Sequence, residues 1–301
     1  MQWRCFLNKL NVNIGGLELK NPLLLASGVW DTDSPVEIEV YGAVILKGVN
    51  LNGRKGNPPP RIYDIQCGVI NSIGLENGGV DELNRKIEKI KGRTKLIANI
   101  FGSTVEEYKD VAERLKGIDG IEINVSCPNV KDSGIAFGRS PEYVEKIAAL
   151  VKKVSNVPVF VKLTPDTDRL EDIALAAEKA GADAVVCANT YTGMAIDINT
   201  GKPILGGTTG GVSGPCIKPL TVYRVWKLRR VLKIPIIASG GIASWQDVIE
   251  YIMAGADAVE IGSIIFRNLD AGTEIISGLN KYLEEKNIHH ILDIRGGVHD
   301  G

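Results

Sequence analysis

The chain contains Ala180-Gly181-Ala182-Asp183-Ala184-Val185-Val186 and repeats it, with one change, as Ala254-Gly255-Ala256-Asp257-Ala258-Val259-Glu260. In each copy a helical pattern ends, a glycine follows that can close the helix in the left-handed conformation, and an apolar run begins. Apolar runs of this kind are typical of parallel strands that are covered on both faces. The repeat therefore predicts two helix–turn–parallel strand units.

The same alternation extends over most of the chain. Apolar or alternating runs predict eight strands at residues 23–26, 43–46, 96–100, 121–125, 157–163, 184–188, 235–238 and 258–261. Helical spacing and end signals predict helices at 81–91, from 104, and at 141–154, 170–180, 219–232, 245–254 and 271–285. Eight strands separated by helices favour a single-domain α/β fold, the closed (β/α)8 TIM barrel, over a doubly wound open sheet.

Three segments fall outside this alternation. Residues 12–20 alternate around Gly15-Gly16 and predict a short N-terminal hairpin. Residues 51–75, rich in Gly, Pro and Asn, predict an excursion over the C-terminal face of the barrel, and a long loop is expected after residue 188. We expect one barrel domain over residues 10–301 and a disordered tail at residues 1–9.

Composition limits the class of protein. The 301 residues are 44% hydrophobic and 24% charged, which is typical of a soluble globular protein. A net charge of -1 gives no general attraction to nucleic acid or anionic membranes. No apolar run reaches the roughly 20 residues of a membrane span, and Arg4, Asn8 and Lys9 argue against a secretory signal. We expect a cytoplasmic protein.

Cysteine and histidine usage narrows the chemistry. The five cysteines form no CxxC pair, which predicts reduced thiols and no zinc or iron–sulfur site in this chain. The three histidines all lie near the C-terminus. Acid–base chemistry elsewhere must therefore use other side chains.

The predicted strands end in polar residues or glycine, and in a (β/α)8 barrel these ends form the working face. Lys47 and Lys162 each finish an apolar strand. A buried ammonium needs an anionic or strongly accepting partner, so both lysines are candidates to face an anion; the alternative is that they emerge into solvent.

Glycine-rich segments at residues 206–214, 239–241 and 262–263 allow backbone N–H groups to approach an anion. Two of them follow the seventh and eighth strands, where such barrels commonly hold phosphate. No GxGxxG motif is present, so a Rossmann-type nicotinamide site is not expected. Flavin mononucleotide (FMN) with a small heterocyclic substrate fits this pattern, because a lysine near the N1–O2 edge stabilises the reduced flavin.

Cys127 follows the strand at 121–125, and Pro128 prevents the strand from continuing. It is the most plausible base among the strand-end residues, consistent with removal of a carbon-bound proton. The alternative is an inert, packed thiol.

These residues resemble the dihydroorotate dehydrogenase family. The resemblance is carried by Asn124-Val125-Ser126-Cys127-Pro128-Asn129-Val130 followed by Phe137-Gly138, and by the segments 21–28, 56–61, 71–75, 161–163, 189–190, 213–215 and 239–241. It covers the chain from about residue 10 to about residue 287.

The resemblance implies a soluble class 1 enzyme of pyrimidine biosynthesis, because cysteine stands where the membrane-bound class has serine. Residues 129–138 and 73–78 are most similar to the NAD-linked branch, class 1B. That branch implies a separate electron-transfer subunit with FAD and a 2Fe-2S cluster, in a heterotetramer or around a homodimer core.

The resemblance also implies a role for each matching residue. Cys127 would take the C5 proton of dihydroorotate while a hydride leaves C6 for flavin N5, with Lys47 and Lys162 as further catalytic residues. The substrate would be held by Lys47, Asn71, Gly74, Leu75, Asn124, Asn129, Asn189 and Thr190. FMN would be held by Ala26, Ser27, Lys47, Gly48, Asn99, Asn124, Lys162, Ala188, Gly214, Gly240, Gly241, Gly262 and Ser263. Gly48-Val49 and Ser263 depart from the usual family pattern, and no metal ligand is implied.

Three other functions remain open at this stage. A dihydropyrimidine dehydrogenase-type subunit acting on uracil would share the barrel, the flavin and a cysteine acid, but would need no cation for a substrate carboxylate. A non-flavin aldolase or sugar-phosphate isomerase could use the same barrel. A catalytically silent binding subunit is disfavoured because the motif residues are present.

Overall fold

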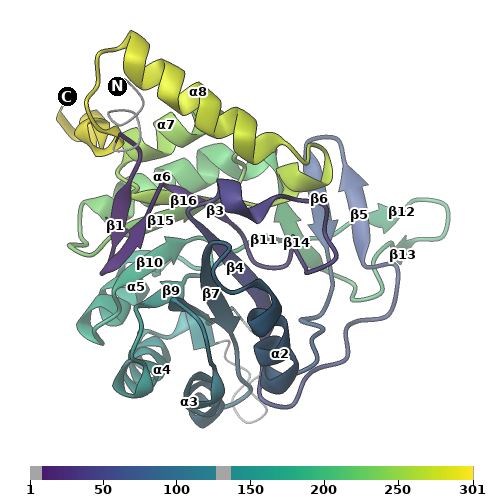
Figure 1. The fold of residues 1–301 in the computed structure, drawn as a ribbon. Coiled ribbons are helices and arrows are strands. Elements are labelled where there is room, and N and C mark those ends of the chain that lie inside the picture. The colour runs from purple at the N-terminus through teal and green to yellow at the C-terminus, as the bar shows by residue number, and fades with distance from the viewer. Residues whose placement is uncertain (1–8, 127–136, 301) are drawn as a thin grey trace.

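Eight parallel strands close into a barrel in the computed structural model, which describes residues 9–126 and 137–300 (Figure 1). The barrel strands are β3 (Leu23–Leu25), β4 (Ala43–Val49), β7 (Lys95–Ile100), β8 (Gly120–Asn124), β9 (Val159–Lys162), β10 (Ala184–Cys187), β15 (Ile236–Ser239) and β16 (Ala258–Ile261). They are neighbours in chain order, and β16 pairs with β3 to close the ring. The predicted (β/α)8 barrel is confirmed.

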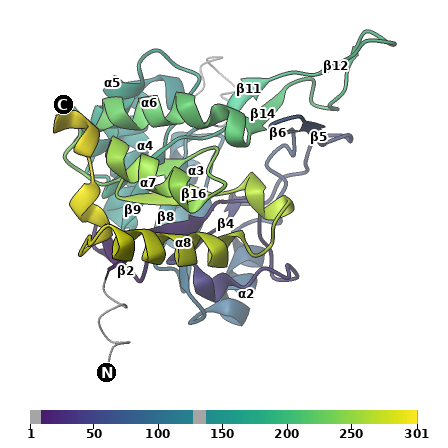
Figure 2. The ribbon, with the colours of Figure 1, turned by 90° about the horizontal axis from the view of Figure 1, so that it is seen from above.

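Helices surround the barrel (Figures 1 and 2). They are α2 (Val80–Ile90), α3 (Val105–Arg114), α4 (Pro141–Val154), α5 (Leu170–Lys179), α6 (Lys218–Arg229), α7 (Trp245–Ala254) and α8 (Ala271–Glu285). The hydroxyls of Thr104, Ser140 and Ser244 accept backbone N–H groups at the starts of α3, α4 and α7. Because these caps satisfy otherwise unpaired donors, the predicted helix starts lie close to the observed ones.

The two faces of a barrel strand bury different side chains. All five residues of β8 are buried, including Glu122 and Asn124. Since side chains alternate along a strand, Ile121 and Ile123 point to the helices while Glu122 and Asn124 point into the barrel. The alternation that predicted this strand therefore has its polar side inside the barrel rather than in solvent.

The amino-terminal end of the barrel is covered by the predicted hairpin, β1 (Val12–Ile14) and β2 (Leu17–Leu19). A Cβ added at Gly15, where φ is 57°, would lie 2.4 Å from Cβ of Asp183 at the start of β10. Glycine thus permits the hairpin turn to pack directly on the barrel. Residues 1–8 of the predicted tail lie outside the described residues; the carbonyl of Lys9 accepts the N–H of Ile291 at 2.9 Å.

A four-stranded antiparallel sheet covers the opposite end. It consists of β11 (Tyr191–Gly193), β14 (Gly210–Ser213), β6 (Gly68–Asn71) and β5 (Ile62–Ile65), in that order. Figure 1 places this sheet on the far side of the barrel from β1. The excursion predicted at residues 51–75 is confirmed, since β5 and β6 belong to it.

The long loop expected after residue 188 contains strands that were not predicted. This segment contributes β11 and β14 to the covering sheet, and its hairpin of β12 (Ile196–Asp197) and β13 (Lys202–Pro203) projects from the body (Figure 2). The strand β14 contains two glycines and little apolar periodicity. It is a strand because it pairs with β6, which lies far away in the sequence, and pairing of that kind leaves little local signal.

The repeated Asp183 and Asp257 stabilise the amino-terminal ends of the strands. Asp257 accepts the Ile236 N–H at 2.8 Å, and Asp183 accepts the Val159 N–H at 2.7 Å, so each joins its strand to the preceding one. Asp119 does the same for the Leu96 N–H at 3.0 Å. The repeat in the sequence is therefore a repeated structural device.

These aspartates differ in burial and in their cationic partners. Asp257 has a side chain that is 4% exposed and pairs with Arg229 and Arg295. The side chain of Asp183 is 21% exposed and that of Asp119 is 31% exposed, and each pairs with one lysine.

We expect Asp257→Ala to lower the free energy of unfolding by about 3 kcal/mol, because it leaves the largely buried Arg229 without its carboxylate and the buried Ile236 N–H without its acceptor. The matched variant Asp119→Ala breaks a more exposed pair and should cost about 1 kcal/mol. Urea denaturation of both variants at neutral pH, followed by circular dichroism, measures the difference. Equal losses would show that burial of the ion pair does not set its contribution.

Candidate active site

A cavity of about 570 Å³ lies at the carboxyl ends of the barrel strands, beneath the covering sheet. A volume of this size suits a small-molecule or cofactor site. Every predicted site residue within the described part of the chain lines it, except Gly214. Cys127 and Asn129 lie outside the described residues. Ser126, which directly precedes Cys127, lines the cavity, and its buried hydroxyl has no hydrogen-bond partner among the described residues.

Lys47 lies at an irregularity in β4, where the register with β7 shifts between Leu46 and Val49. Its side chain is exposed and lines the cavity, and no ion pair of its ammonium is found within residues 9–126 and 137–300. Because bulges of this kind redirect side chains, β4 can present a cation to the cavity. Lys47 is thus available to an anionic ligand.

Lys162 at the end of β9 has anionic partners inside the barrel. Its Nζ lies 2.6 Å from Glu260 Oε2 and 3.4 Å from Glu122 Oε1, and Asn99 Nδ2 donates to Glu122 Oε1 at 2.5 Å. Burial lowers the pKa of Lys162, but the two carboxylates outweigh this effect and raise it. The alternative that this lysine emerges into solvent is wrong.

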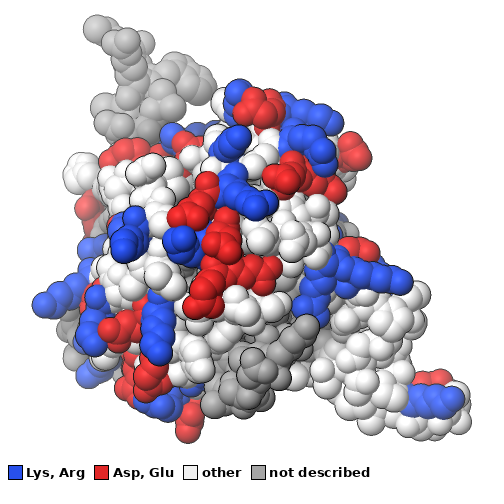
Figure 3. Space-filling model, turned by 90° about the horizontal axis from the view of Figure 1, so that it is seen from below, with Lys and Arg blue, Asp and Glu red and all other residues white. Residues whose placement is uncertain are grey.

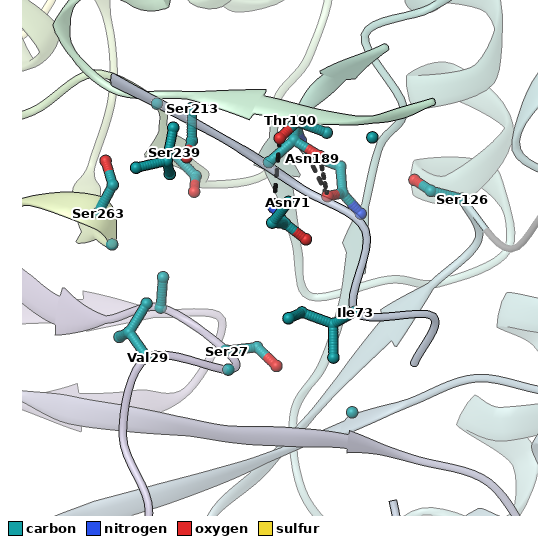
Figure 4. Close-up of a pocket in the computed structure, with 18 of the residues that line it drawn as sticks. Ser27, Val29, Asn71, Ile73, Ser126, Asn189, Thr190, Ser213, Ser239 and Ser263 are labelled. Carbon is teal, nitrogen blue, oxygen red and sulfur yellow. Dashed lines mark hydrogen bonds between the residues drawn. The ribbon is translucent and has the colours of Figure 1, made fainter. Parts of the chain in front are cut away.

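Amide side chains form a second group, on the side of the cavity under the covering sheet. Asn124 Oδ1 accepts Asn189 Nδ2 at 3.2 Å, and Asn189 Oδ1 accepts the Thr190 N–H at 2.8 Å. Asn71 Nδ2 donates to the Gly211 carbonyl at 3.2 Å, and Figure 4 shows Asn71, Asn189 and Thr190 close together. These hydrogen bonds fix amides that can pair with a polar ring.

Hydroxyls and a glycine turn form another part of the wall. Ser213, Ser239 and Ser263 come from three different segments and lie on the same side of the cavity in Figure 4. The turn after β15 contains Gly240 and Gly241, with φ values of 145° and 72°. Hydroxyls and closely approaching backbone are typical of a phosphate site.

Glycine and left-handed backbone are required at two further places. A Cβ at Gly48 would lie 2.6 Å from Asn99 Oδ1, so a side chain at this position would displace Asn99. Gly74 has φ of 80° and a Cβ there would lie 2.6 Å from Asn57, while Leu75 follows with φ of 57°. The tight turn brings both residues to the cavity.

Other predicted glycines have a packing role. A Cβ at Gly214 would lie 2.5 Å from Gly68 Cα, and one at Gly206 would lie 2.1 Å from the Pro58 carbonyl oxygen. The segment 206–214 therefore lets the covering sheet and the segment beneath it approach closely. The prediction that its glycines approach a ligand anion is not needed to explain them.

Sequence reasoning missed Glu122 and Glu260, the partners of Lys162. Glu260 is the one mismatch in the repeat, standing where the other copy has Val186, and a carboxylate in an otherwise apolar strand is a usable signal. Glu122 alternates with apolar residues in the predicted strand 121–125, and that pattern does not reveal its partner on another strand. Further lining residues that were not predicted include Ile62, Thr164, Asp166, Thr192, Phe266 and the hydroxyl-bearing Ser213 and Ser239.

Two further searches were confined to the described part of the chain. No cluster of three or more His, Cys, Asp or Glu side chains there is placed to bind a metal ion. No helix in these residues combines the length and apolarity needed to cross a membrane.

Acidic and basic side chains are interspersed over the face shown in Figure 3.

Comparison with known proteins gives one consistent result. The family model named dihydroorotate dehydrogenase matches residues 9–283. A protein of Caldicellulosiruptor saccharolyticus is 44% identical over 296 residues, which cover 96% of this chain and 99% of that protein. A protein of Brachyspira hyodysenteriae is 44% identical over 302 residues, covering 97% and 100%, and one of Thermoanaerobacter sp. is 43% identical over 297 residues, covering 96% and 98%.

All three relatives are named dihydroorotate dehydrogenase B (NAD(+)), catalytic subunit. The match to the family model extends over nearly all of the barrel described above. The chain belongs to the dihydroorotate dehydrogenase family.

Proposed function

We propose that this chain oxidises (S)-dihydroorotate to orotate in pyrimidine biosynthesis, as an FMN-dependent enzyme of the cytoplasm. One observation carries the proposal: the same cavity holds an exposed lysine, Lys47, that has no ion-pair partner among the described residues, and a fixed group of amides. Both lie in the cavity that Ser126, the residue before Cys127, also lines. Dihydroorotate carries a carboxylate and a polar ring, which match these two features. Residues 10–301 would form the single FMN-binding domain.

The cavity residues fit FMN. The hydroxyls of Ser213, Ser239 and Ser263 and the Gly240–Gly241 turn offer donors and close backbone for a phosphate. Lys162 offers an ammonium, held rigidly by Glu260, for the edge of the ring that becomes negative on reduction. When bound, the flavin supplies the acceptor for the substrate hydride. The other residues proposed to hold FMN also line the cavity: Ala26, Ser27, Gly48, Asn99, Ala188 and Gly262.

The substrate would lie between the flavin and the covering sheet. Lys47 would pair with its carboxylate, because this ammonium has no ion-pair partner in the described residues. Asn71, Asn124, Asn189 and Thr190, with the backbone at Gly74 and Leu75 and with Asn129, would hold the polar ring. Fixed amides on strands or strand ends would orient the ring at little cost in conformational entropy.

Cys127 would remove the proton from C5 of the substrate. The support is its place one residue after Ser126, which lines the cavity. In these proteins of the NAD-linked branch, the electrons would leave through a partner subunit that carries FAD and a 2Fe-2S cluster, in a heterotetramer or around a homodimer. The names of the relatives, catalytic subunit and NAD(+), support this part of the proposal.

We expect Lys47→Met to raise the KM for dihydroorotate about 100-fold, because a charged hydrogen bond contributes roughly 1.5–3 kcal/mol. Steady-state assays of the purified, FMN-loaded protein with an artificial electron acceptor measure it. Dihydrouracil, which lacks the carboxylate, serves as the comparison substrate, and the exposed Lys202→Met is the control variant. Faster turnover of dihydrouracil than of dihydroorotate by the unaltered protein would favour the uracil-type function instead.

We expect Cys127→Ser to lower kcat at neutral pH on the order of a hundredfold, because a hydroxyl is a much weaker general base than a thiol. In the unaltered enzyme, activity should rise toward alkaline pH, since an ordinary thiol with a pKa near 8.5 is only about 3% thiolate at pH 7. A pH series of kcat for both proteins measures this. Turnover of the serine variant equal to that of the unaltered enzyme would remove the role of Cys127 as base.

A further inference from the structure

Two carboxylates and one ammonium meet inside the barrel. Glu122 on β8 and Glu260 on β16 have completely buried side chains, and Lys162 on β9 has a side chain that is 8% exposed. Glu122 Oε2 and Glu260 Oε1 have no hydrogen-bond partner among the described residues. With all three groups ionised, the cluster would carry a net charge of -1.

A net charge in such a place is costly. Burial of an unpaired ion remains strongly unfavourable even after the protein relaxes. Uptake of one proton by a carboxylate makes the cluster neutral and converts an unpartnered oxygen into a hydroxyl. The charge count therefore favours one carboxylic acid and one carboxylate.

The geometry shows which carboxyl group keeps the proton. Lys162 Nζ is 2.6 Å from Glu260 and 3.4 Å from Glu122, so Glu260 receives the stronger charge-assisted hydrogen bond. The shortest hydrogen bond to Glu122 within the described residues comes from the neutral Asn99 at 2.5 Å, while the one from Lys162 is 3.4 Å long. Burial, followed by the negative charge of Glu260, raises the pKa of Glu122 to about 8.

The other strands that face Glu122 contribute no further charge. Asn99 on β7 is neutral, and the largest charge effects on the pKa of Glu122 come from Glu260 and Lys162. Lys47 on β4 is exposed and extends into the cavity. The three-residue cluster can therefore be treated as one unit.

We propose that Glu260 and Glu122 are positioning residues for the flavin side of the site: Glu260, as a carboxylate, holds the Lys162 ammonium toward the cavity, and Glu122 is a carboxylic acid whose ionisation changes the charge next to the flavin. This inference rests on the proposed function, because Lys162 is placed there at the flavin ring. Glu260 also lines the cavity, so its charge lies close to any ring bound there.

The charge of Glu122 determines the direction in which its ionisation shifts the midpoint potential of the bound flavin. While Glu122 holds its proton the cluster is neutral, and loss of that proton toward alkaline pH makes the cluster negative. Two-electron reduction adds negative charge to a flavin, and a negative Glu122 opposes this addition. The midpoint potential of the bound flavin should therefore fall more steeply with pH above about 8 than below it.

The first test needs no flavin. Infrared spectra of the flavin-free protein should show the carbonyl band of a buried carboxylic acid at pH 7, lost toward pH 10 and absent in Glu122→Gln. Glu145→Gln on the surface of α4 is the matched control and should retain the band. Absence of the band from the unaltered protein at pH 7 would overturn the proposal, whether or not the chain binds FMN.

The second test uses the FMN-loaded protein. Glutamine resembles the neutral carboxylic acid, so Glu122→Gln should leave the midpoint potential at pH 7 unchanged and abolish the bend near pH 8. Glu260→Gln removes the carboxylate that pairs with Lys162 and should shift the potential at pH 7 and abolish the infrared band, because Glu122 then becomes the counter-ion. If instead Glu260→Gln left the midpoint potential at pH 7 unchanged and Glu122→Gln shifted it, the assignment of the proton to Glu122 would be overturned.

Discussion

Closure of eight parallel strands into a ring is the constraint from which the remaining features follow. It brings all carboxyl ends to one face and all amino ends to the other, and it leaves no strand edge for solvent to hydrate. At the amino-terminal end, the backbone N–H groups of neighbouring strands donate to the carboxylates of Asp119, Asp183 and Asp257. The β1–β2 hairpin covers this end of the barrel. At the carboxyl end the strands finish in polar residues, and the covering sheet encloses a cavity above them instead of filling it.

Burial distinguishes two lysines that look alike in the sequence. Lys47 and Lys162 both follow three apolar strand residues, yet one is exposed in the cavity and the other is enclosed by carboxylates. An ammonium that already has Glu260 at 2.6 Å gains less from a new anion than one without a partner. Among the described residues the cavity therefore offers a cation without an ion-pair partner at Lys47 and a charge-compensated one at Lys162. This difference suits the proposed roles, a permanent substrate charge at Lys47 and a transient flavin charge at Lys162.

The sequence was sufficient for the barrel because each strand and helix carries its own local pattern. The strand β14 was not predictable, since Gly210 and Gly211 provide no periodicity and pairing with β6 alone makes the segment extended. The site was predictable where a residue type is unusual for its position, as at Lys47 and Asn124. Glu122 and Glu260 were missed because their role depends on side chains that meet across the barrel, and distances across the barrel are not encoded in strand spacing.

The cavity has a rigid wall, built from barrel strands, and a more adaptable wall, built from the covering sheet. Lys162, Glu122 and Glu260 are side chains of barrel strands, whose positions are fixed by hydrogen bonds to two neighbouring strands. Asn71 is the last residue of β6 in the covering sheet, and Thr190 directly precedes β11. Both segments are insertions into the barrel pattern. Because sites built on strands are held more precisely than sites on insertions, the side of the cavity that contains Lys162 is the preorganised one. A change of substrate within this fold would therefore require changes in the covering sheet, while the cluster of Lys162, Glu122 and Glu260 could stay the same.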